Sequence, residues 1–481
     1  MVKAVEEKGI KLVLLWKGDI INMVSMSNSI NKRTILFVTA LSFFLATFMG
    51  SAINIALPTI GDELQMDAIL LGWVATAYIL ASVIFLLPFG RLADIYGRKR
   101  FLTYGIFIYT IASLLLSFTP SATVLISLRA VQGIGGAMIF STGTAIVTSV
   151  FPVGERGKAL GISVAVAYLG LSLGPVLGGL LTQHFGWRSI FLATVPLGIA
   201  AIALIFGKVK GEWAEAKGEK FDTIGSIIYG FALTGIVYGV TLLPGTLGIW
   251  LIITGGSGIF AFVKREEKIK HPVLDISLFK KNRVFVLSNL AVLLNYSAAF
   301  AVSFLLSLYL QFIKGLNPQN AGLILVTMPV VQAIFSTVAG RLSDRFEPRI
   351  LASIGMALTT FGLALFISIN EKTSLGFITV GLITLGFGFA LFASPNTNAI
   401  MSSVKQRFYG VASATLATTR QLGMVFSMAI TMLLFTIYMG RVEITPEHYS
   451  PFLSSVKVAF TIFTILCCAG IFASLAGRRK H

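Results

Sequence analysis

The sequence predicts an all-helical (all-α) integral membrane protein with fourteen transmembrane helices, and three observations lead to this fold class. Hydrophobic residues make up 56% of the 481 residues and charged residues only 12%, which is too few charges to cover a soluble protein. Apolar runs of about 20 residues, long enough to cross the hydrocarbon core as helices, recur along the chain. A charged motif after an early run returns after a later one, which indicates duplicated halves.

The expected spans form two groups of six with a pair between them. A six-helix N-terminal bundle at 34–207 follows a tail at 1–33, and a six-helix C-terminal bundle at 284–476 precedes a tail at 477–481. The stretch 208–283 holds the inserted pair with its flanking loops. The spans lie near residues 34–57, 70–90, 101–118, 122–148, 159–182, 187–207, 222–243, 247–263, 284–311, 320–341, 349–369, 374–399, 409–437 and 456–476.

The basic residues indicate how the spans are oriented. Of the 38 Lys and Arg residues, most lie in the N-terminal segment, in every second loop and in the C-terminal tail. The other loops and their flanking ends contain only Arg188, Lys314, Lys372, Arg441 and Lys457. Because basic loops stay on the cytoplasmic side, both termini are expected in the cytoplasm and the protein in the cell (plasma) membrane. The net charge of +18 thus signals orientation, and nucleic acid is not an expected partner.

Several other features are excluded or set aside. The apolar core LVLLW of the N-terminal tail is too short for a signal peptide, and Met23 and Met26 are alternative starts. Cys467 and Cys468 are adjacent inside the last span, which excludes a disulfide framework. The chain contains no GxxxxGK[ST] loop, nucleophile–base pair or metal-ligand cluster. An enzyme, a cofactor and a metal site are therefore not expected.

The repeated motif is GRLADIYGRKR, which recurs as GRLSDRFEPR. Each copy follows the second span of a six-span group. Asp94 can sit at the positive N-terminal end of a neighbouring helix while Arg98 pairs nearby, and such a contact can hold one conformation and break in another. We interpret the motif as a conformational latch, with a mere topology signal as the alternative; its residues are Gly90, Asp94, Arg98, Gly340 and Asp344.

A second pattern consists of glycines four residues apart in GLSLGPVLGG. Gly170, Gly174 and Gly178 share one helix face, and Pro175 lies between them. Small residues at this spacing allow two membrane helices to pack closely, and the proline allows a kink. Packing alone is a sufficient explanation of the pattern.

Polar residues inside the spans are the candidates for the transport path. Arg129 lies near the outer end of the fourth span with Gln132 on its helix face, and Arg420 lies deeper in the thirteenth. A guanidinium in hydrocarbon is expensive and should face protein or a wet cavity. Snorkelling is the alternative for Arg129. Uncharged polar groups usually bond neighbouring helices; those selected for the path are Asn54, Gln332, Asn396 and Asn398.

Together these motifs resemble the major facilitator superfamily, in particular its fourteen-span drug:proton antiporter branch of multidrug efflux type, over residues 34–476. GRLADIYGRKR is similar to the family's loop signature, LRAVQGIGGA to its fourth-helix motif and GLSLGPVLGG to its fifth-helix antiporter motif. WRSIFLATVPLG and the ending of INIALP are similar to signatures of the branch. The resemblance implies alternating access around a central cavity, and a fifth-helix face that controls leak during exchange.

The resemblance leaves the coupling ion open. The branch carries a first-helix motif of the form LDxTIxNxALP, and counting back from Pro58 places Met49 at its aspartate. None of the 20 acidic residues lies in the middle of an expected span. A proton would therefore bind at the periphery or on the substrate. Without an embedded acid, and with Arg129 and Arg420 inside, neutral or anionic amphiphiles are favoured over cationic drugs.

The sequence thus predicts a secondary transporter that exports drugs or other small amphipathic molecules, with proton coupling left open. An uncoupled facilitator or an importer is the nearest alternative, and a receptor or scaffold without transport is the alternative of another class. The expected partners are a small-molecule substrate and the lipid bilayer. A monomer is favoured, and the residues do not identify the substrate.

Overall fold

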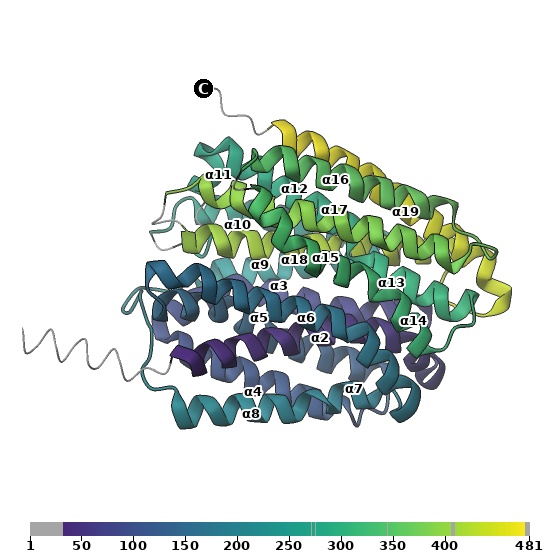
Figure 1. The fold of residues 1–481 in the computed structure, drawn as a ribbon, viewed down its shortest axis with the longest axis horizontal. Coiled ribbons are helices and arrows are strands. Elements are labelled where there is room, and N and C mark those ends of the chain that lie inside the picture. Colours follow the sequence, from purple (N-terminus) through teal and green to yellow (C-terminus); the bar gives the residue numbers. More distant parts are fainter. Residues whose placement is uncertain (1–31, 271, 275, 344, 406–408, 477–481) are drawn as a thin grey trace, which may run out of the picture.

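The computed structural model describes residues 32–270, 272–274, 276–343, 345–405 and 409–476, and within them it contains helices and connecting loops but no strand (Figure 1). Fourteen helical segments in these ranges are long and apolar enough to cross a membrane, which confirms the predicted fold class. The predictions for the two tails and for Asp344 lie outside the described residues.

The N-terminal half contains the first six spans. The helices that form them are α2 (Lys32–Leu64), α3 (Ala68–Tyr96), α4 (Arg98–Leu116), α5 (Ala122–Val150), α6 (Val153–Phe185), α7 (Arg188–Leu192) and α8 (Thr194–Lys208). Short polar side chains begin several of them; for example, Asp67 Oδ1 accepts a hydrogen bond from Leu70 N at 2.7 Å. The first span is longer than the predicted 34–57, because α2 continues through Pro58 as far as Leu64.

The C-terminal half contains the last six spans, preceded by the short α11 (Ser277–Lys281). Four of its spans combine several pieces, and a π-helical turn, η1, ends the first of them. The elements are α12 (Arg283–Ala299), α13 (Ala301–Leu308), η1 (Tyr309–Ile313), α14 (Pro318–Leu325), α15 (Thr327–Ser343), α16 (Pro348–Leu365), η2 (Phe366–Ser368), α17 (Leu375–Ser402), α18 (Tyr409–Tyr438), η4 (Pro446–His448) and α19 (Tyr449–Ala476).

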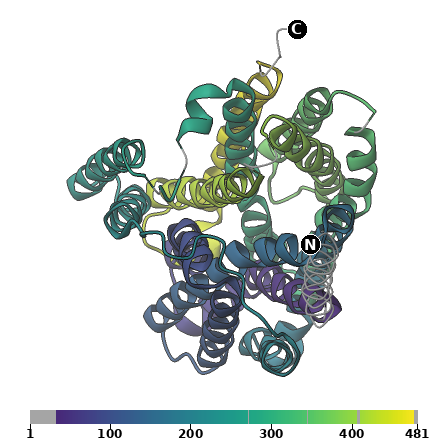
Figure 2. The ribbon, with the colours of Figure 1, turned by 90° about the vertical axis from the view of Figure 1, so that its left-hand side faces the viewer.

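The inserted pair consists of α9 (Thr223–Thr241) and α10 (Thr246–Glu266), which lie beside the two halves (Figure 2). Glycines bring the two helices together: a methyl group on Gly239 would lie 2.8 Å from Gly248 O. Of the two helices, α9 packs against both α3 and α18. The inserted pair therefore touches one helix from each half.

The bundle has two ends, which differ in their content of basic residues. The basic face is the end at which α2 begins and α19 ends, where the loops rich in Lys and Arg lie, and Figure 2 looks onto it. The other end is called the opposite face. If the orientation expected from the basic residues holds, the basic face is cytoplasmic.

Candidate transport site

Main-chain carbonyls near the opposite face join the two halves. Ser307 Oγ on α13 donates to the carbonyl oxygen of Asn54 on α2 at 2.6 Å, and Gln311 Nε2 on η1 donates to that of Ile55 at 2.9 Å. Asn54, which we predicted to line the path, is buried here, with 5% of its surface exposed. Its carbonyl therefore takes part in closing the bundle.

A second closure lies between α6 and α14. A methyl group on Gly322 would lie 2.1 Å from the Pro175 carbonyl oxygen, and one on Gly179 would lie 2.5 Å from that of Pro318. His184 Nε2 and Gln319 Oε1 are 3.2 Å apart across the same junction. Because the backbones touch here, the halves are sealed at this end of the seam.

Below this closure, five polar and aromatic residues gather near the middle of the spans. Tyr168, at the centre of α6, lies close to Gln332 on α15, and also to Tyr296 and Arg420 of the C-terminal half. Arg420 Nη2 donates to Thr397 Oγ1 at 2.8 Å, and its guanidinium lies 5.9 Å from the Tyr296 ring. The cluster therefore joins side chains from both halves; we call it the central cluster, and its members are Tyr168, Tyr296, Gln332, Thr397 and Arg420.

The two asparagines selected from α17 differ in their surroundings. Asn396 is buried, and its Nδ2 donates to Ser288 O at 3.2 Å. Asn398 is partly exposed, and its Nδ2 donates to Ser343 Oγ at 3.3 Å. Asn396 thus bonds α17 to α12, whereas Asn398 lies closer to the basic face. A role for either in the path stays a prediction.

Arg129 is enclosed within the N-terminal half. Its Nε donates to Val74 O at 3.1 Å, its Nη1 donates to Gln132 Oε1, and its guanidinium lies 4.6 Å from the Tyr78 ring. Gln132 Nε2 in turn donates to Ser113 Oγ at 2.8 Å. Arg129 is 1% exposed and Gln132 is completely buried. In this conformation the two residues hold α5 against α3 and α4, and their role in the transport path stays a prediction.

The glycine face of α6 packs against a polar stripe of α2 that contains Thr47 and Ser51. A methyl group on Gly170 would lie 2.3 Å from Thr47 Oγ1, and one on Gly174 would lie 1.8 Å from Ser51 Oγ. Gly178 meets the α2 backbone in the same way, 2.9 Å from the Cα of Ala52. The glycines thus allow α2 and α6 to touch along their length, and Pro175 lies inside α6 at the junction with α14.

The described spans hold no acid at their centre. Met49, the position of the family's aspartate, is completely buried together with Ala52, Ile53 and Ala56 on its helix face. No group of three or more His, Cys, Asp or Glu residues in the described chain could hold a metal ion. A carboxylate at Met49 would therefore face packed apolar side chains in this conformation.

Near the basic face, the residues of the predicted latch make contacts centred on Arg98. Gly97, with φ of +122°, ends α3 and separates it from α4. Arg98 Nε donates to Asp94 Oδ1 at 2.7 Å and Nη1 donates to Ser149 Oγ on α5 at 2.6 Å. Arg98 is 7% exposed. The predicted Asp94–Arg98 contact is therefore present, while its role as a latch stays a prediction.

The glycines of the two motif copies lie at helix contacts. A methyl group on Gly90 would have ordinary contact, 3.7 Å, with Ser141 of α5. One on Gly340 would lie 3.1 Å from Ser394 Oγ of α17. The second copy thus approaches its neighbour more closely than the first.

The loop after α8 covers this latch. Glu215 accepts from Arg98 at 2.6 and 3.0 Å, Glu219 pairs with Arg91, and Glu212 accepts from Lys99 N at 2.7 Å. Arg98 N also donates to Trp213 O, at 2.8 Å. We call residues 212–219 the acidic linker. The Arg98 guanidinium holds the pKa of the Glu215 carboxyl below its usual range, against the opposing effect of burial.

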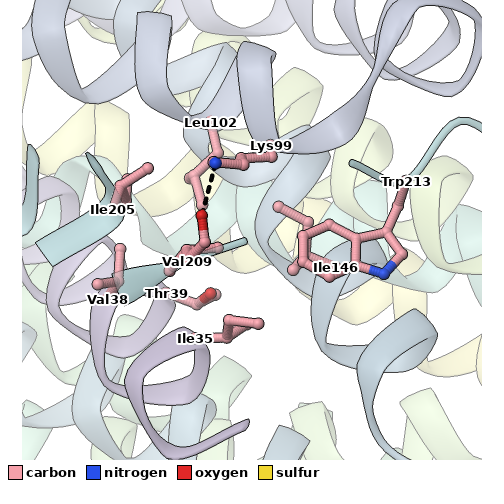
Figure 3. A pocket seen from close by; sticks show the side chains of 9 residues that line it. All are labelled: Ile35, Val38, Thr39, Lys99, Leu102, Ile146, Ile205, Val209 and Trp213. Atoms are coloured by element: carbon pink, nitrogen blue, oxygen red, sulfur yellow. Dashed lines mark hydrogen bonds between the residues drawn. The ribbon is translucent and has the colours of Figure 1, made fainter. Parts of the chain in front are cut away.

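Trp213 anchors the acidic linker in a small pocket (Figure 3). Lys99 reaches across it, and its Nζ donates to Val209 O at 2.6 Å. The pocket volume is about 10 Å³, enough for one water molecule at most. The pocket therefore seats the loop and cannot hold a substrate. Its other lining residues are Ile35, Val38, Thr39, Leu102, Ile146 and Ile205.

Sequence reasoning missed several residues of these contacts. Tyr168, Tyr296 and Thr397 were not selected, because a single aromatic residue or threonine inside an apolar span carries no pattern. In the sequence, Glu212, Glu215 and Glu219 lie within an expected loop of the stretch 208–283. Their spacing along 212–219 was visible, but nothing in the sequence indicated that the loop folds back onto the repeated motif.

Curated relatives match most of the chain. It is 31% identical to the riboflavin transporter RibZ of Clostridioides difficile, over 93% of this chain and 98% of that protein. It is 30% identical to the multidrug resistance protein Stp of Mycobacterium tuberculosis, over 82% and 74%. It is 28% identical to the multidrug efflux pump LfrA of Mycolicibacterium smegmatis, over 86% and 84%.

Solved structures share the fold. The chain superposes on a bacterial homologue of the human lysosomal transporter Spinster with a TM-score of 0.64 at 15% identity, covering 93% of this chain and 98% of that one. For the nucleoside transporter NupG the TM-score is 0.62 at 14% identity, with 93% and 100% covered. The model of the Major Facilitator Superfamily matches residues 39–428, and the chain therefore belongs to this family of transporters, which are not enzymes.

Proposed function

We propose that this transporter exports small amphipathic molecules, drugs among them, across the plasma membrane by alternating access between its two halves. The observation that carries the proposal is the central cluster. It combines Tyr168 of one half with Arg420 and Tyr296 of the other, at residues near the middle of their helices. It lies below the seal that Ser307 and Asn54 form near the opposite face. A site at the seam of two halves changes its access when the halves rock.

Export is favoured by several relatives. Stp and LfrA are named for multidrug resistance and efflux, and the methylenomycin A resistance protein of Bacillus subtilis is 31% identical over 85% of this chain and 88% of that protein. Polar and aromatic side chains together suit molecules with both polar and flat apolar parts.

Transport of a vitamin-like solute is the second candidate. It is favoured by the similarity to RibZ, which covers nearly all of both chains. A flat heteroaromatic molecule would fit beside Tyr168 and Tyr296 as readily as a drug. The two candidates differ in substrate range.

Proton coupling would have to use carboxylates at the ends of spans. Asp62 and Glu63 are the acids nearest the end of α2, and Glu63 is already engaged, because Trp187 Nε1 donates to it at 2.7 Å. A proton carried by the substrate itself is the other route.

Purified protein in proteoliposomes tests the proposal. A panel of amphipathic drugs, dyes and riboflavin is offered with and without a pH gradient, and protein-free vesicles serve as the control. We expect at least one compound to move faster than in the control. Outward-only movement of several unrelated compounds would favour export, and selective riboflavin movement would favour the second candidate. If no compound moves, the proposal is wrong.

A further inference from the structure

The two arginines inside the spans differ in how far their charge is satisfied. Arg129 directs its guanidinium at a carbonyl, an amide and a tyrosine ring. Within the part of the chain that the structure describes, Arg420 makes one hydrogen bond, to Thr397, and its buried Nε has no partner. No carboxylate pairs with Arg420 among the described residues. Arg420 is therefore a cation with unused donors.

Two tyrosine side chains surround Arg420. Tyr296 and Tyr168 flank the guanidinium from two different halves. Arg420 itself is only partly buried, so its exposed part reaches the seam that these residues share.

We propose that Arg420 binds the acidic group of an aromatic anion, such as a carboxylate or sulfonate, while Tyr168 and Tyr296 contact its ring; this assignment of substrate class rests on the proposed transport function. An uncompensated guanidinium in a membrane is unfavourable, and a bound anion supplies the missing charge. The planar guanidinium of Arg420 can donate two parallel hydrogen bonds to two oxygens of a carboxylate or sulfonate. A cationic ligand would meet no counter-charge in this cluster.

Three flat fluorescent probes of different charge test the site in purified protein in nanodiscs. At mildly alkaline pH, fluorescein is anionic, riboflavin neutral and ethidium cationic. We expect wild-type protein to bind fluorescein most tightly. Arg420→Gln should weaken fluorescein binding about tenfold and change riboflavin binding less than about threefold. Arg420→Lys, which keeps the charge but loses the fork, should fall between.

Arg441→Gln is the matched control, because Arg441 is exposed in a loop near the opposite face. It should leave all three affinities unchanged. Thr397→Val tests the same site without removing the charge, since it takes away the one acceptor that orients the Arg420 guanidinium among the described residues. It should also weaken fluorescein binding if Arg420→Gln protein does not fold.

Equal fluorescein affinity in wild-type protein and both site variants would overturn the assignment, as would tighter binding of ethidium than of fluorescein. If ethidium or riboflavin moved in proteoliposomes and fluorescein did not bind, the proposed anion site would be wrong and the proposed transport function would stand. If no compound of the panel moved, the proposed transport function itself would be wrong.

An independent observation concerns the acidic linker. Its three glutamates each meet a partner in the loop motif of the N-terminal half. Ala216 N adds a backbone bond to Asp94 O at 2.9 Å. The linker continues directly into α9, whose start is fixed to α10 by Arg265 and Asp222, 2.8 Å apart. Since α9 touches α3 and α18, the linker connects the latch to both halves.

We infer that the acidic linker clamps the latch and stabilises the conformation closed at the opposite face. While Arg98 is bonded to Glu215 of the linker, its guanidinium cannot bind the end of another helix. For the halves to exchange partners at the basic face, Arg98 must first leave Glu215, or the linker must move with it. The linker thus controls the conformation of the loop motif through the contacts of its glutamate side chains.

The clamp is tested by opening at the opposite face. Ser307→Cys, in a Cys467→Ser/Cys468→Ser background, reports this opening, because Ser307 is completely buried in the closed seam. Changing Glu212, Glu215 and Glu219 together to Gln should increase the rate of thiol labelling several-fold. Deuterium uptake at 212–219 should rise as well.

Glu155→Gln is the matched control, because Glu155 pairs with Lys32 at the basic face away from the linker. It should leave the labelling rate unchanged. Trp213→Ala tests the same clamp without altering charge. The inference would be overturned if both linker variants were labelled at the wild-type rate although deuterium exchange showed that the linker was released. It would also be overturned if deuterium uptake at 212–219 in both variants were the same as in wild-type protein.

Acidification gives a second readout of the clamp. The Glu215 carboxylate faces Arg98 and Ser149, with Arg156 nearby and Asp94 sharing Arg98. Its pKa is lowered in the folded protein. The stabilisation is therefore fully present above the ordinary glutamate pKa and is lost as pH falls through the lowered value. Deuterium exchange at matched chemical rates should show linker release at acidic pH in wild-type protein. The pH step should be smaller in Glu215→Gln, in which Glu212 and Glu219 still hold the linker.

Discussion

Arg129 and Arg420 are both arginines inside spans, yet their contacts differ, and so should the effects of replacing them. Arg129→Gln removes a charged donor from Val74 O and Gln132, and each such bond contributes about 1.5–3 kcal/mol. We expect a lower thermal midpoint in detergent and a reduced yield. Arg420→Gln, which loses one bond, should change the midpoint less. Equal midpoints would show that the Arg129 contacts do not hold α5 in place.

Met49 is a second residue whose surroundings decide the outcome. The position is completely buried among small apolar side chains, so Met49→Asp should destabilise the protein by roughly 2.5–3.5 kcal/mol, as an acid inside a membrane protein does. Met49→Leu, which conserves volume, should cost less than about 1.5 kcal/mol. Expression and thermal midpoint measure both. A stable Met49→Asp protein with new pH-dependent transport would mean that this position reaches water during the cycle.

At the scale of elements, the contact of α2 with α6 depends on glycine. A methyl group on Gly174 would lie 1.8 Å from Ser51 Oγ and 2.9 Å from Phe48 O, so the helices must separate. Gly174→Ala should destabilise the protein by about 1–3 kcal/mol and slow transport.

Gly161→Ala on the same helix is the control, because a methyl group there meets nothing within 4 Å. It should be neutral or slightly stabilising, since alanine is the better helix former. Similar melting and transport in the two variants would show that the α2–α6 contact is not tight in the membrane.

The elements also show what the sequence could predict. Apolar runs gave the number and order of spans, because membrane helices need about 20 apolar residues each. The Asp94–Arg98 pair could be expected from spacing alone. The polar stripe of Thr47 and Ser51 could not be matched with Gly170 and Gly174, since contacts between distant segments leave no mark in one sequence. The same holds for Glu215 against Arg98 and for Tyr168 beside Arg420.

For the whole molecule, the distribution of basic residues predicts that the basic face is cytoplasmic. Cysteines at Lys217 and Lys268, in the Cys467→Ser/Cys468→Ser background, should not react with an impermeant reagent added to intact cells. A cysteine at Lys372, exposed in a loop near the opposite face, should react. The reverse pattern would invert the orientation, and with it the side of the membrane on which this conformation is closed.

The central claim is that transport requires the seam at the opposite face to open and close. His184 on α6 and Gln319 on α14 face each other there, with their side-chain atoms 3.2 Å apart. Cysteines at both positions, joined by a short cleavable bis-thiol reagent in the Cys467→Ser/Cys468→Ser background, hold the seam shut. The measurement is substrate movement in proteoliposomes before tethering, after tethering and after cleavage of the reagent. We expect tethering to stop transport and cleavage to restore it. Transport by the tethered protein at the untethered rate would contradict alternating access at this seam.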